Sequence, residues 1–273
     1  MTSSRIAFLD VDGTILDHGR TVAPSTVEAI RGARAAGHLV LLSTGRSAAD
    51  IHPEVRAIGF DGAITNGGAF ATVGDETVVA RPMPRAAAQR LMAYFDEHGI
   101  HFFLQSDDGV YASARVRELV SSLASRWMQR PDNVAMPRFH DLDGIDMDAV
   151  AKAVFVSDRT GTVDQVQADL GASFHVVPGS MPLPGGSNGE VGLRGVTKGS
   201  AITTVLEHLG RTAADAIGIG DSWNDVEMFE VCGVGIAMGN AEPELQERAD
   251  EITTSVAHDG VYNAFVKHGL IPG

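Results

Sequence analysis

Cysteine is almost absent from this chain of 273 residues, which contains Cys232 alone. A single cysteine excludes an intrachain disulfide and a cysteine-based zinc site, so we expect Cys232 to be a small buried side chain. No stretch approaches the ~20 consecutive apolar residues of a membrane span, and the apolar run near Met1 is too short for a signal peptide. We therefore expect a soluble, cytoplasmic protein.

Positive charge is also scarce. The chain has 21 lysines and arginines against 35 aspartates and glutamates, which gives a formal net charge of −14. This balance argues against a nucleic-acid backbone or an anionic membrane as a partner. Lysine itself occurs only at Lys152, Lys198 and Lys267, so each lysine is a candidate for a specific role. The surplus of carboxylates suits a divalent cation, although most of them belong to the solvated surface.

Short apolar runs alternate with amphipathic segments in the first and last parts of the chain. In the first part we predict strands at Arg5–Val11, His38–Ser43 and Gly62–Thr65, joined by helices at Pro24–Ala36 and Ala48–Ile58. Strands alternating with helices at this spacing are typical of a parallel sheet. The last part repeats the pattern, with helices at Lys198–Leu209 and Asp225–Val231 and strands at Ala216–Gly220 and Val234–Ala237.

Between these two parts the pattern changes. A proline-containing linker, Arg81–Pro84, and a long loop rich in proline and glycine, Pro178–Gly189, enclose a segment with helices and strands of its own. We predict an α/β protein with a Rossmann-like, parallel-sheet core formed by residues 1–83 and 190–273. Residues 84–189 would form a second α/β domain inserted into that core.

The strongest local signal is Asp10-Val11-Asp12-Gly13-Thr14, directly after the first predicted strand. In parallel α/β sheets, ligands bind at the carboxyl ends of strands. Side chains two residues apart on an extended chain share a face, so Asp10 and Asp12 can point toward one centre. Two close carboxylates repel each other unless a cation or a proton lies between them. By itself the segment is also compatible with an acidic turn, the less favoured alternative.

Two further segments have features of phosphate-binding sites. Thr44-Gly45-Arg46 ends the second strand with a hydroxyl and a glycine, which could present Thr44 and a backbone N–H to a phosphate oxygen. Lys198 begins a predicted helix, where a cation opposes the helix dipole unless an anionic ligand lies nearby. Taken singly, these are also an ordinary turn and a surface lysine.

A fourth segment, Gly220-Asp221-Ser222-Trp223-Asn224-Asp225, follows another apolar strand. Asp221 and Asp225 add two carboxylates, Asn224 adds an amide, and oxygen ligands of this kind suit Mg²⁺. The alternative is a helix N-cap, a position that Asn and Asp favour.

Together and in this order, the four segments resemble the four signature motifs of the haloacid dehalogenase-like hydrolase superfamily. The Cof-type branch, sugar-phosphate phosphatases with a large α/β cap, is the most similar. The segments Thr65-Asn66-Gly67-Gly68, Val196-Thr197-Lys198-Gly199 and Asp259-Gly260-Val261 are also similar to that branch. Far more residues separate Thr44 from Lys198 than a core connection needs, so the inserted cap lies between the second and third motifs.

The resemblance implies a Mg²⁺-dependent phosphatase. Asp10 would attack phosphorus and become an aspartyl phosphate, while Asp12 would protonate the leaving alkoxide and then deprotonate the hydrolytic water. Mg²⁺ would be held by Asp10, by the backbone carbonyl of Asp12 and by Asp221, with Asp225 in direct or water-mediated support.

It also implies a set of phosphate-binding residues. Thr44 and Lys198 would bind phosphate oxygens and stabilise the transition state, with Asn224 in support and Gly45, Arg46 and Asn66 as further candidates. The expected partner is a small phosphorylated metabolite, a sugar phosphate foremost, and the expected assembly is a monomer or homodimer. We expect the cap segments Gln105–Asp108 and Pro178–Asn188 to set specificity.

Two other functions use similar residues. A phosphomutase on the same fold would return the phosphoryl group to its substrate instead of releasing inorganic phosphate. A phospho-receiver signalling module also has an acidic cluster, a threonine and a lysine on a parallel sheet. A receiver, however, would be about half this length and would lack both the inserted domain and the Gly220–Asp225 segment.

Overall fold

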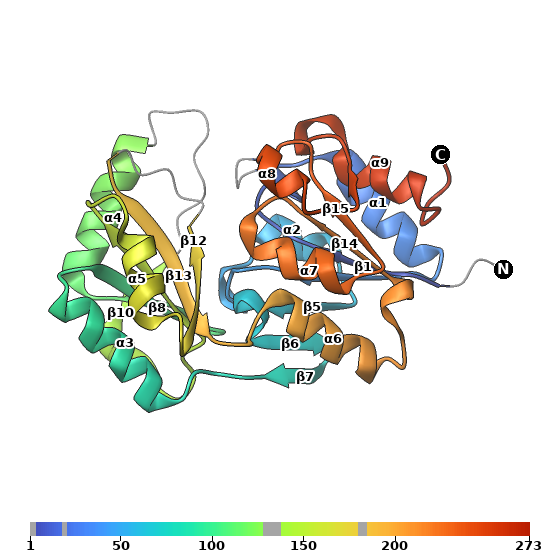
Figure 1. Ribbon diagram of the computed structural model, residues 1–273. Coiled ribbons are helices and arrows are strands. Elements are labelled where there is room, and N and C mark those ends of the chain that lie inside the picture. The colour runs from blue at the N-terminus through green and yellow to red at the C-terminus, as the bar shows by residue number, and fades with distance from the viewer. Residues whose placement is uncertain (1–3, 18–20, 128–137, 180–184) are drawn as a thin grey trace.

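The computed structural model describes residues 4–17, 21–127, 138–179 and 185–273. Two sheets lie side by side, each with its own helices (Figure 1). The first and last parts of the chain, blue and orange to red, share one unit, and the green and yellow middle part forms the other. The predicted insertion of one α/β unit into another is therefore confirmed. Within the described ranges, no helix is long and apolar enough to cross a membrane.

The first sheet has the strand order β16-β15-β14-β1-β4-β5-β6-β7. Neighbouring strands from β16 to β5 are parallel, and β6 and β7 add an antiparallel hairpin at the β5 edge. The strands of this sheet are β1 (Ile6–Leu9), β4 (Leu39–Ser43), β5 (Gly62–Thr65), β6 (Phe70–Val73), β7 (Glu76–Ala80), β14 (Ala216–Gly220), β15 (Val234–Ala237) and β16 (Glu251–Ile252).

Helices cover both faces of this sheet because its central strands are apolar on both sides. In β1, Ala7 and Leu9 pack against α1, α2 and α9, while Ile6 and Phe8 pack against α6 and α7. The helices of this unit are α1 (Pro24–Ala35), α2 (Pro53–Ile58), α6 (Lys198–His208), α7 (Val226–Val231), α8 (Pro243–Gln246) and α9 (Gly260–Lys267).

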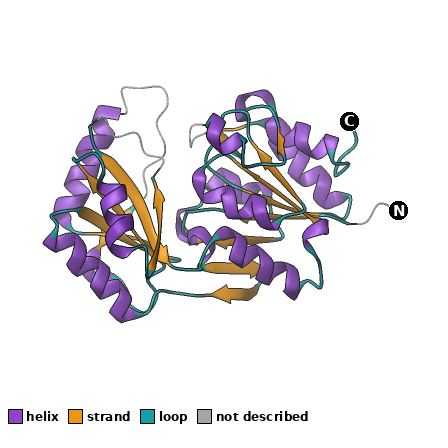
Figure 2. Cartoon of the chain, in the orientation of Figure 1, coloured by secondary structure: helices purple, strands orange, loops and turns teal. Residues whose placement is uncertain are grey.

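The second sheet has the order β10-β9-β8-β11-β13-β12 and is largely antiparallel. Its helices α3 and α5 cover the outer face, and the strands face the first unit (Figure 2). Its elements are α3 (Arg85–Glu97), β8 (His101–Ser106), β9 (Gly109–Ala112), α4 (Ala114–Trp127), β10 (Phe139–Asp141), β11 (Lys152–Ser157), α5 (Thr162–Leu170), β12 (Phe174–Pro178) and β13 (Ser187–Leu193).

Three features of the fold differ from the predicted elements, and one of the differences has a local cause. The helix predicted over Ala48–Ile58 is a short 3₁₀ turn followed by α2, because Pro53 favours the first turn of a new helix. The hairpin of β6 and β7 was not predicted. The expected domain boundary between residues 189 and 190 falls inside β13, which pairs along its whole length within the second sheet.

The order of strands in the first sheet defines where a ligand can bind. From β1 the chain proceeds to β4 and β5 on one side, and after the second sheet it returns to β14 and β15 on the other. The carboxyl ends of β1 and β14 therefore flank the point at which the order reverses. In open α/β sheets this is the position of the ligand crevice.

Candidate active site

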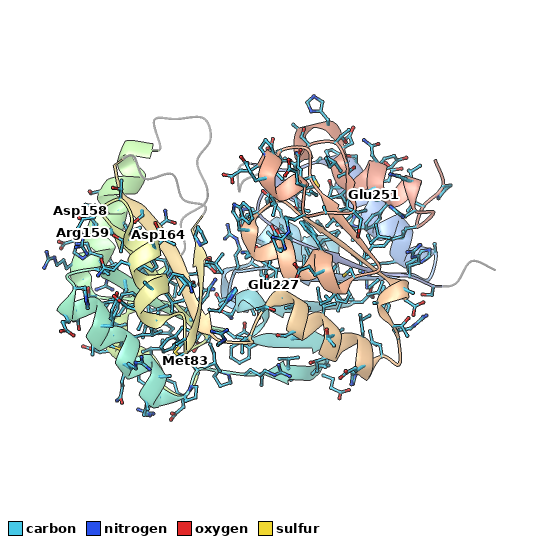
Figure 3. All side chains as sticks on the ribbon, in the orientation of Figure 1. Met83, Asp158, Arg159, Asp164, Glu227 and Glu251 are labelled. Carbon is cyan, nitrogen blue, oxygen red and sulfur yellow. The ribbon has the colours of Figure 1, made fainter. Side chains whose placement is uncertain are left out.

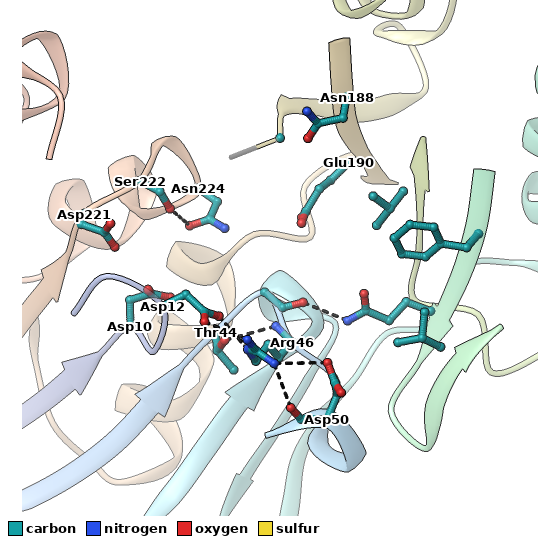
Figure 4. A pocket seen from close by; sticks show the side chains of 16 residues that line it. Asp10, Asp12, Thr44, Arg46, Asp50, Asn188, Glu190, Asp221, Ser222 and Asn224 are labelled. Atoms are coloured by element: carbon teal, nitrogen blue, oxygen red, sulfur yellow. Dashed lines mark hydrogen bonds and ion pairs between the residues drawn. The ribbon is translucent and has the colours of Figure 1, made fainter. Parts of the chain in front are cut away.

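A cavity of about 220 Å³ lies at this point, between the two sheets (Figure 4). Asp10 and Asp12 follow β1, Thr44 to Arg46 follow β4, and Asp221 to Asn224 follow β14. The other lining residues come from the 3₁₀ turn after β4, from the second sheet and from the residue after β12: Asp50, Phe103, Gln105, Val110, Val154, Gly179, Asn188 and Glu190.

Lys198 connects the predicted third motif to the first and the fourth. It begins α6, is fully buried, and places Nζ 2.7 Å from Oδ1 of Asp10 and 2.6 Å from Oδ1 of Asp225. Burial by itself would lower the pKa of Lys198, but the two carboxylates outweigh burial and raise it above its ordinary value. The two acids therefore favour the charged form of Lys198 between them.

The carboxylates of Asp10 and Asp221 lie in a strongly unfavourable electrostatic environment. Burial raises the pKa of Asp10 to about 7; Lys198 opposes the shift, and Asp225 and Asp12 add to it. Burial, followed by repulsion from Asp10 and Asp225, raises the pKa of Asp221 to about 9. More negative charge is thus gathered here than the protein's own cations neutralise.

This imbalance fits a divalent cation. Asp10, Asp221 and Asp225 each offer a carboxylate oxygen, and these atoms all lie within 4.8 Å of one another. Three acids face one ammonium group, that of Lys198, so ionisation of all three would leave two negative charges to be balanced. Carboxylate oxygens are the ligands that Mg²⁺ uses in proteins, so the residues present suit the ion that the sequence predicts.

Asp225 has a supporting position. Its Oδ1 accepts from Lys198, and its Oδ2 accepts from the backbone N–H groups of Asp221 and Ser222 at 3.1 and 3.0 Å. Both oxygens are therefore engaged within the protein, and Asp225 holds the loop that presents Asp221. Gly13 makes room for that side chain, because a Cβ there would lie 2.0 Å from Oδ2 of Asp221.

Asp12 points toward Arg46, whose Nε and Nη2 lie 2.6 and 2.8 Å from its two carboxylate oxygens (Figure 4). Arg46 also lies 3.3 Å from Asp50. Asp50 was not predicted, and its only sequence signal is its position on the turn four residues after Arg46. The guanidinium group thus neutralises Asp12 and defines the orientation of its side chain.

The predicted phosphate-binding residues divide into two groups. Thr44, Gly45, Arg46 and Asn224 line the cavity, and Lys198 lies directly behind Asp10. Asn66 does not line it, since its buried amide donates to Oδ1 of Asp107 at 2.9 Å, at the turn between β8 and β9.

The second sheet supplies cavity residues that the motifs did not identify. From the segments expected to set specificity, Gln105, Gly179 and Asn188 line the cavity, while residues 180–184 lie outside the described residues. Phe103 lines it as well, and Phe102 belongs to the core of the second unit. Because side chains alternate along a strand, Phe103 and Gln105 lie on one face of the sheet and Phe102 on the other. The alternation does not predict which of the two faces meets the cavity.

Comparison with known proteins agrees with this geometry. Residues 7–265 match the haloacid dehalogenase-like hydrolase family. Pyridoxal phosphate phosphatase YbhA of Escherichia coli is 27% identical over 97% of this chain and 99% of its own length. A phosphoglycolate phosphatase of Methanothermobacter thermautotrophicus is 29% identical over 95% of this chain and 96% of its own length.

A solved structure shares the fold. The haloacid dehalogenase subclass IIB sugar phosphatase BT4131 superimposes with a TM-score of 0.79 and 22% identity, covering 98% of this chain and 100% of that one. The family match spans nearly all of the sequence, and the four motifs meet at one cavity. The chain therefore belongs to the haloacid dehalogenase-like hydrolase family and is a phosphoric monoester hydrolase.

Proposed function

We propose that this phosphatase hydrolyses small phosphate monoesters, sugar phosphates foremost, through an aspartyl phosphate on Asp10 and with Mg²⁺ as cofactor. The observation that carries the proposal is the buried Lys198 between Asp10 and Asp225, with Asp221 beside them at the cavity. A positive charge in a low-dielectric site can stabilise the charge that develops on a transferred phosphoryl group.

In the first step Asp10 is the nucleophile. Lys198 binds its Oδ1, which leaves Oδ2 to form the bond to phosphorus as the bond from phosphorus to the leaving oxygen breaks. Asp12 gives its proton to that oxygen. In the second step water attacks phosphorus and gives a proton to Asp12, and the bond to Asp10 breaks to release inorganic phosphate. Each oxygen of Asp12 accepts one hydrogen bond from Arg46, which leaves a second lone pair on each oxygen for the proton.

A magnesium ion held by Asp10, Asp221 and the backbone carbonyl of Asp12, with Asp225 in support, would supply positive charge that lets an anionic nucleophile approach a phosphate dianion. Thr44 and Asn224, with Gly45 and Arg46 nearby, line the cavity where the phosphate oxygens would lie. The unit formed by residues 84–189 would act as a cap that excludes water from the reacting groups.

A burst experiment tests the two aspartate roles. p-Nitrophenolate leaves without needing a proton, so Asp12→Asn should still be phosphorylated on Asp10 by p-nitrophenyl phosphate. The water that cleaves the intermediate has lost its base, and turnover should fall by about 10²–10⁴-fold. Stopped flow should show a burst near one equivalent of nitrophenolate, followed by a slow steady state.

The controls separate nucleophile from acid. An alkyl sugar phosphate should give no burst with Asp12→Asn, and Asp10→Asn should give neither burst nor turnover with either ester. Equal loss of both phases in folded Asp12→Asn would mean that Asp12 only positions other groups. Release of inorganic phosphate, instead of an isomeric ester, separates a phosphatase from a phosphomutase.

A further inference from the structure

The face of the second sheet that meets the cavity has an apolar part and a charged part. Phe103 on β8 lies opposite Val154 on β11, and Val154 lies opposite Glu190 on β13. Phe103, Val154 and the neighbouring Val110 line the cavity, and Glu190 projects toward it (Figure 4). A leaving group bound here would therefore meet hydrocarbon on one side and a carboxylate on the other.

Glu190 forms an ion pair with Lys152, whose Nζ lies 2.6 Å from its Oε2. The side chain of Lys152 is 5% exposed and that of Glu190 is 29% exposed. Glu190 lines the cavity and Lys152 does not. Glu190 is thus the more exposed member of the pair and lines the cavity, while Lys152 is buried beside it.

This ion pair lies against the loop that carries Thr44. A Cβ added to Gly45 would lie 3.4 Å from Nζ of Lys152 and 3.8 Å from Oε1 of Glu190. Gln105 adds a second contact, donating from Nε2 to the carbonyl oxygen of Gly45 at 2.9 Å. The ion pair therefore stands next to the expected phosphate position, within reach of a small leaving group.

Within the described residues, the three cations that the cavity and its ion pairs involve each have an acidic partner. Arg46 contacts Asp12 and Asp50, Lys198 contacts Asp10 and Asp225, and Lys152 contacts Glu190. Of the cavity-lining residues in the described ranges, Arg46 is the only basic one. A second anionic group on the substrate that lies beside Glu190 would meet a carboxylate whose cation, Lys152, is already paired.

We propose that Glu190, held by Lys152, selects phosphate esters whose leaving alcohol is uncharged or cationic and disfavours those that carry a carboxylate or a second phosphate. This inference rests on the proposed phosphatase function and narrows its substrate class. The hydroxyl groups of a polyol can donate to Glu190 while its carbon skeleton contacts Phe103 and Val154. An anionic group at the same place is opposed by like charge.

Three esters of similar size test the selection. Phosphoglycolate, 2-hydroxyethyl phosphate and phosphoethanolamine carry an anionic, a neutral and a cationic group at the same distance from phosphorus. We expect the wild-type kcat/KM to be lowest for phosphoglycolate, by about tenfold or more relative to the neutral ester. Phosphate release is measured for all three at one pH and ionic strength.

The Glu190→Gln variant exposes the charge of Lys152 to the cavity. The phosphoglycolate to 2-hydroxyethyl phosphate ratio of kcat/KM should rise by about tenfold, because a repelling carboxylate is replaced by an unopposed cation. Comparing this ratio between variant and wild type cancels the intrinsic reactivities of the esters. Glu190→Gln with Lys152→Met removes both charges without leaving a buried ion unpaired, and it should raise the ratio by a smaller factor.

Glu227→Gln is the matched control. Glu227 lies on α7 at the side facing the second sheet (Figure 3), 3.6 Å from His175 of β12, and does not line the cavity. This variant removes the same charge between the two units and should leave the ratio within twofold of wild type.

The outcomes distinguish the inference from the function on which it rests. If no ester, p-nitrophenyl phosphate included, releases phosphate, the proposed function fails. If all esters are hydrolysed and wild type prefers phosphoglycolate, the charge selection is wrong while the phosphatase function stands. An unchanged ratio in both Glu190 variants, with circular dichroism showing native folding, would also overturn the role of Glu190.

Discussion

Arg46 binds both carboxylate oxygens of Asp12, with Nε 2.6 Å from Oδ2 and Nη2 2.8 Å from Oδ1. The hydroxyl of Thr44 accepts from the backbone N–H of Arg46 at 3.1 Å. The side chain proposed as acid and base is therefore positioned by the phosphate-binding loop after β4. Arg46 acts in this arrangement through Asp12 as a positioning residue.

Arg46→Lys tests that role, because lysine keeps the charge and loses the planar fork that binds two oxygens. We expect kcat for an alkyl phosphate to fall by about tenfold or more, since its leaving group needs the proton of Asp12. The first turnover with p-nitrophenyl phosphate, followed by stopped flow, should change much less. Equal losses with both esters would indicate instead that Arg46 acts on the phosphate itself.

Metal binding should release protons. The raised pKa values of Asp10, about 7, and Asp221, about 9, mean that both carboxyl groups retain protons near neutral pH in the metal-free protein. A cation must displace those protons, so the apparent Mg²⁺ affinity should rise with pH up to about 9 and then level off. Calorimetric titration in buffers of different ionisation enthalpy measures the release. An affinity that is constant or falls over this range would contradict the prediction.

Asp221→Asn should stabilise the metal-free protein while abolishing Mg²⁺-dependent activity. A carboxyl whose folded pKa is raised from 3.8 to about 9 holds more protons folded than unfolded between these values. The free energy of unfolding of the metal-free wild type should therefore decrease as pH rises from about 4 toward 9, because the unfolded chain gives up this proton first. At pH 8 the melting temperature of the variant should be about 2–4 °C higher than that of wild type, which corresponds to ~1 kcal/mol in the free energy of unfolding. Near pH 4 the two melting temperatures should differ little.

Thermal denaturation in EDTA measures this effect, and Asp75→Asn, at an exposed turn, is the control. A lower melting temperature for Asp221→Asn at pH 8 would contradict the electrostatic argument.

Asp107 joins the second sheet to the first unit. Its Oδ1 accepts from Thr65 Oγ1 at 2.6 Å, from Asn66 Nδ2 at 2.9 Å and from the backbone N–H of Ala48 at 3.0 Å. In Asp107→Ala, the backbone N–H of Ala48 loses its hydrogen bond to Oδ1. Its hydrogen exchange should accelerate about fivefold, because a hydrogen bond of this kind contributes ~1 kcal/mol to the free energy of local opening.

The variant should also have a higher KM for small esters, because the two units close less firmly on the cavity. Asp108→Ala is the matched control, since that side chain accepts from Ser106 within its own hairpin. Similar exchange at Ala48 in both variants would argue against a docking role for Asp107.

Local patterns were sufficient for the core elements and the motifs. Strands such as β14 and β15 were predicted with their observed bounds, because buried parallel strands are continuous apolar runs flanked by glycine and polar residues. Asp10 and Asp221 were placed at strand ends for the same reason. Their meeting follows from parallel strands presenting their carboxyl ends at one edge of a sheet.

The tertiary structure alone decided which partners these residues have. Lys152 and Glu190 meet because β11 and β13 pair antiparallel, and Asn66 turns from the cavity because the tip of another hairpin reaches it. Such contacts depend on strand register and on how two units close, which no local periodicity encodes. The sequence by itself therefore determined the reactive groups and the edge of the sheet where they gather. Only the folded chain determined which of their charges are neutralised and which face the substrate.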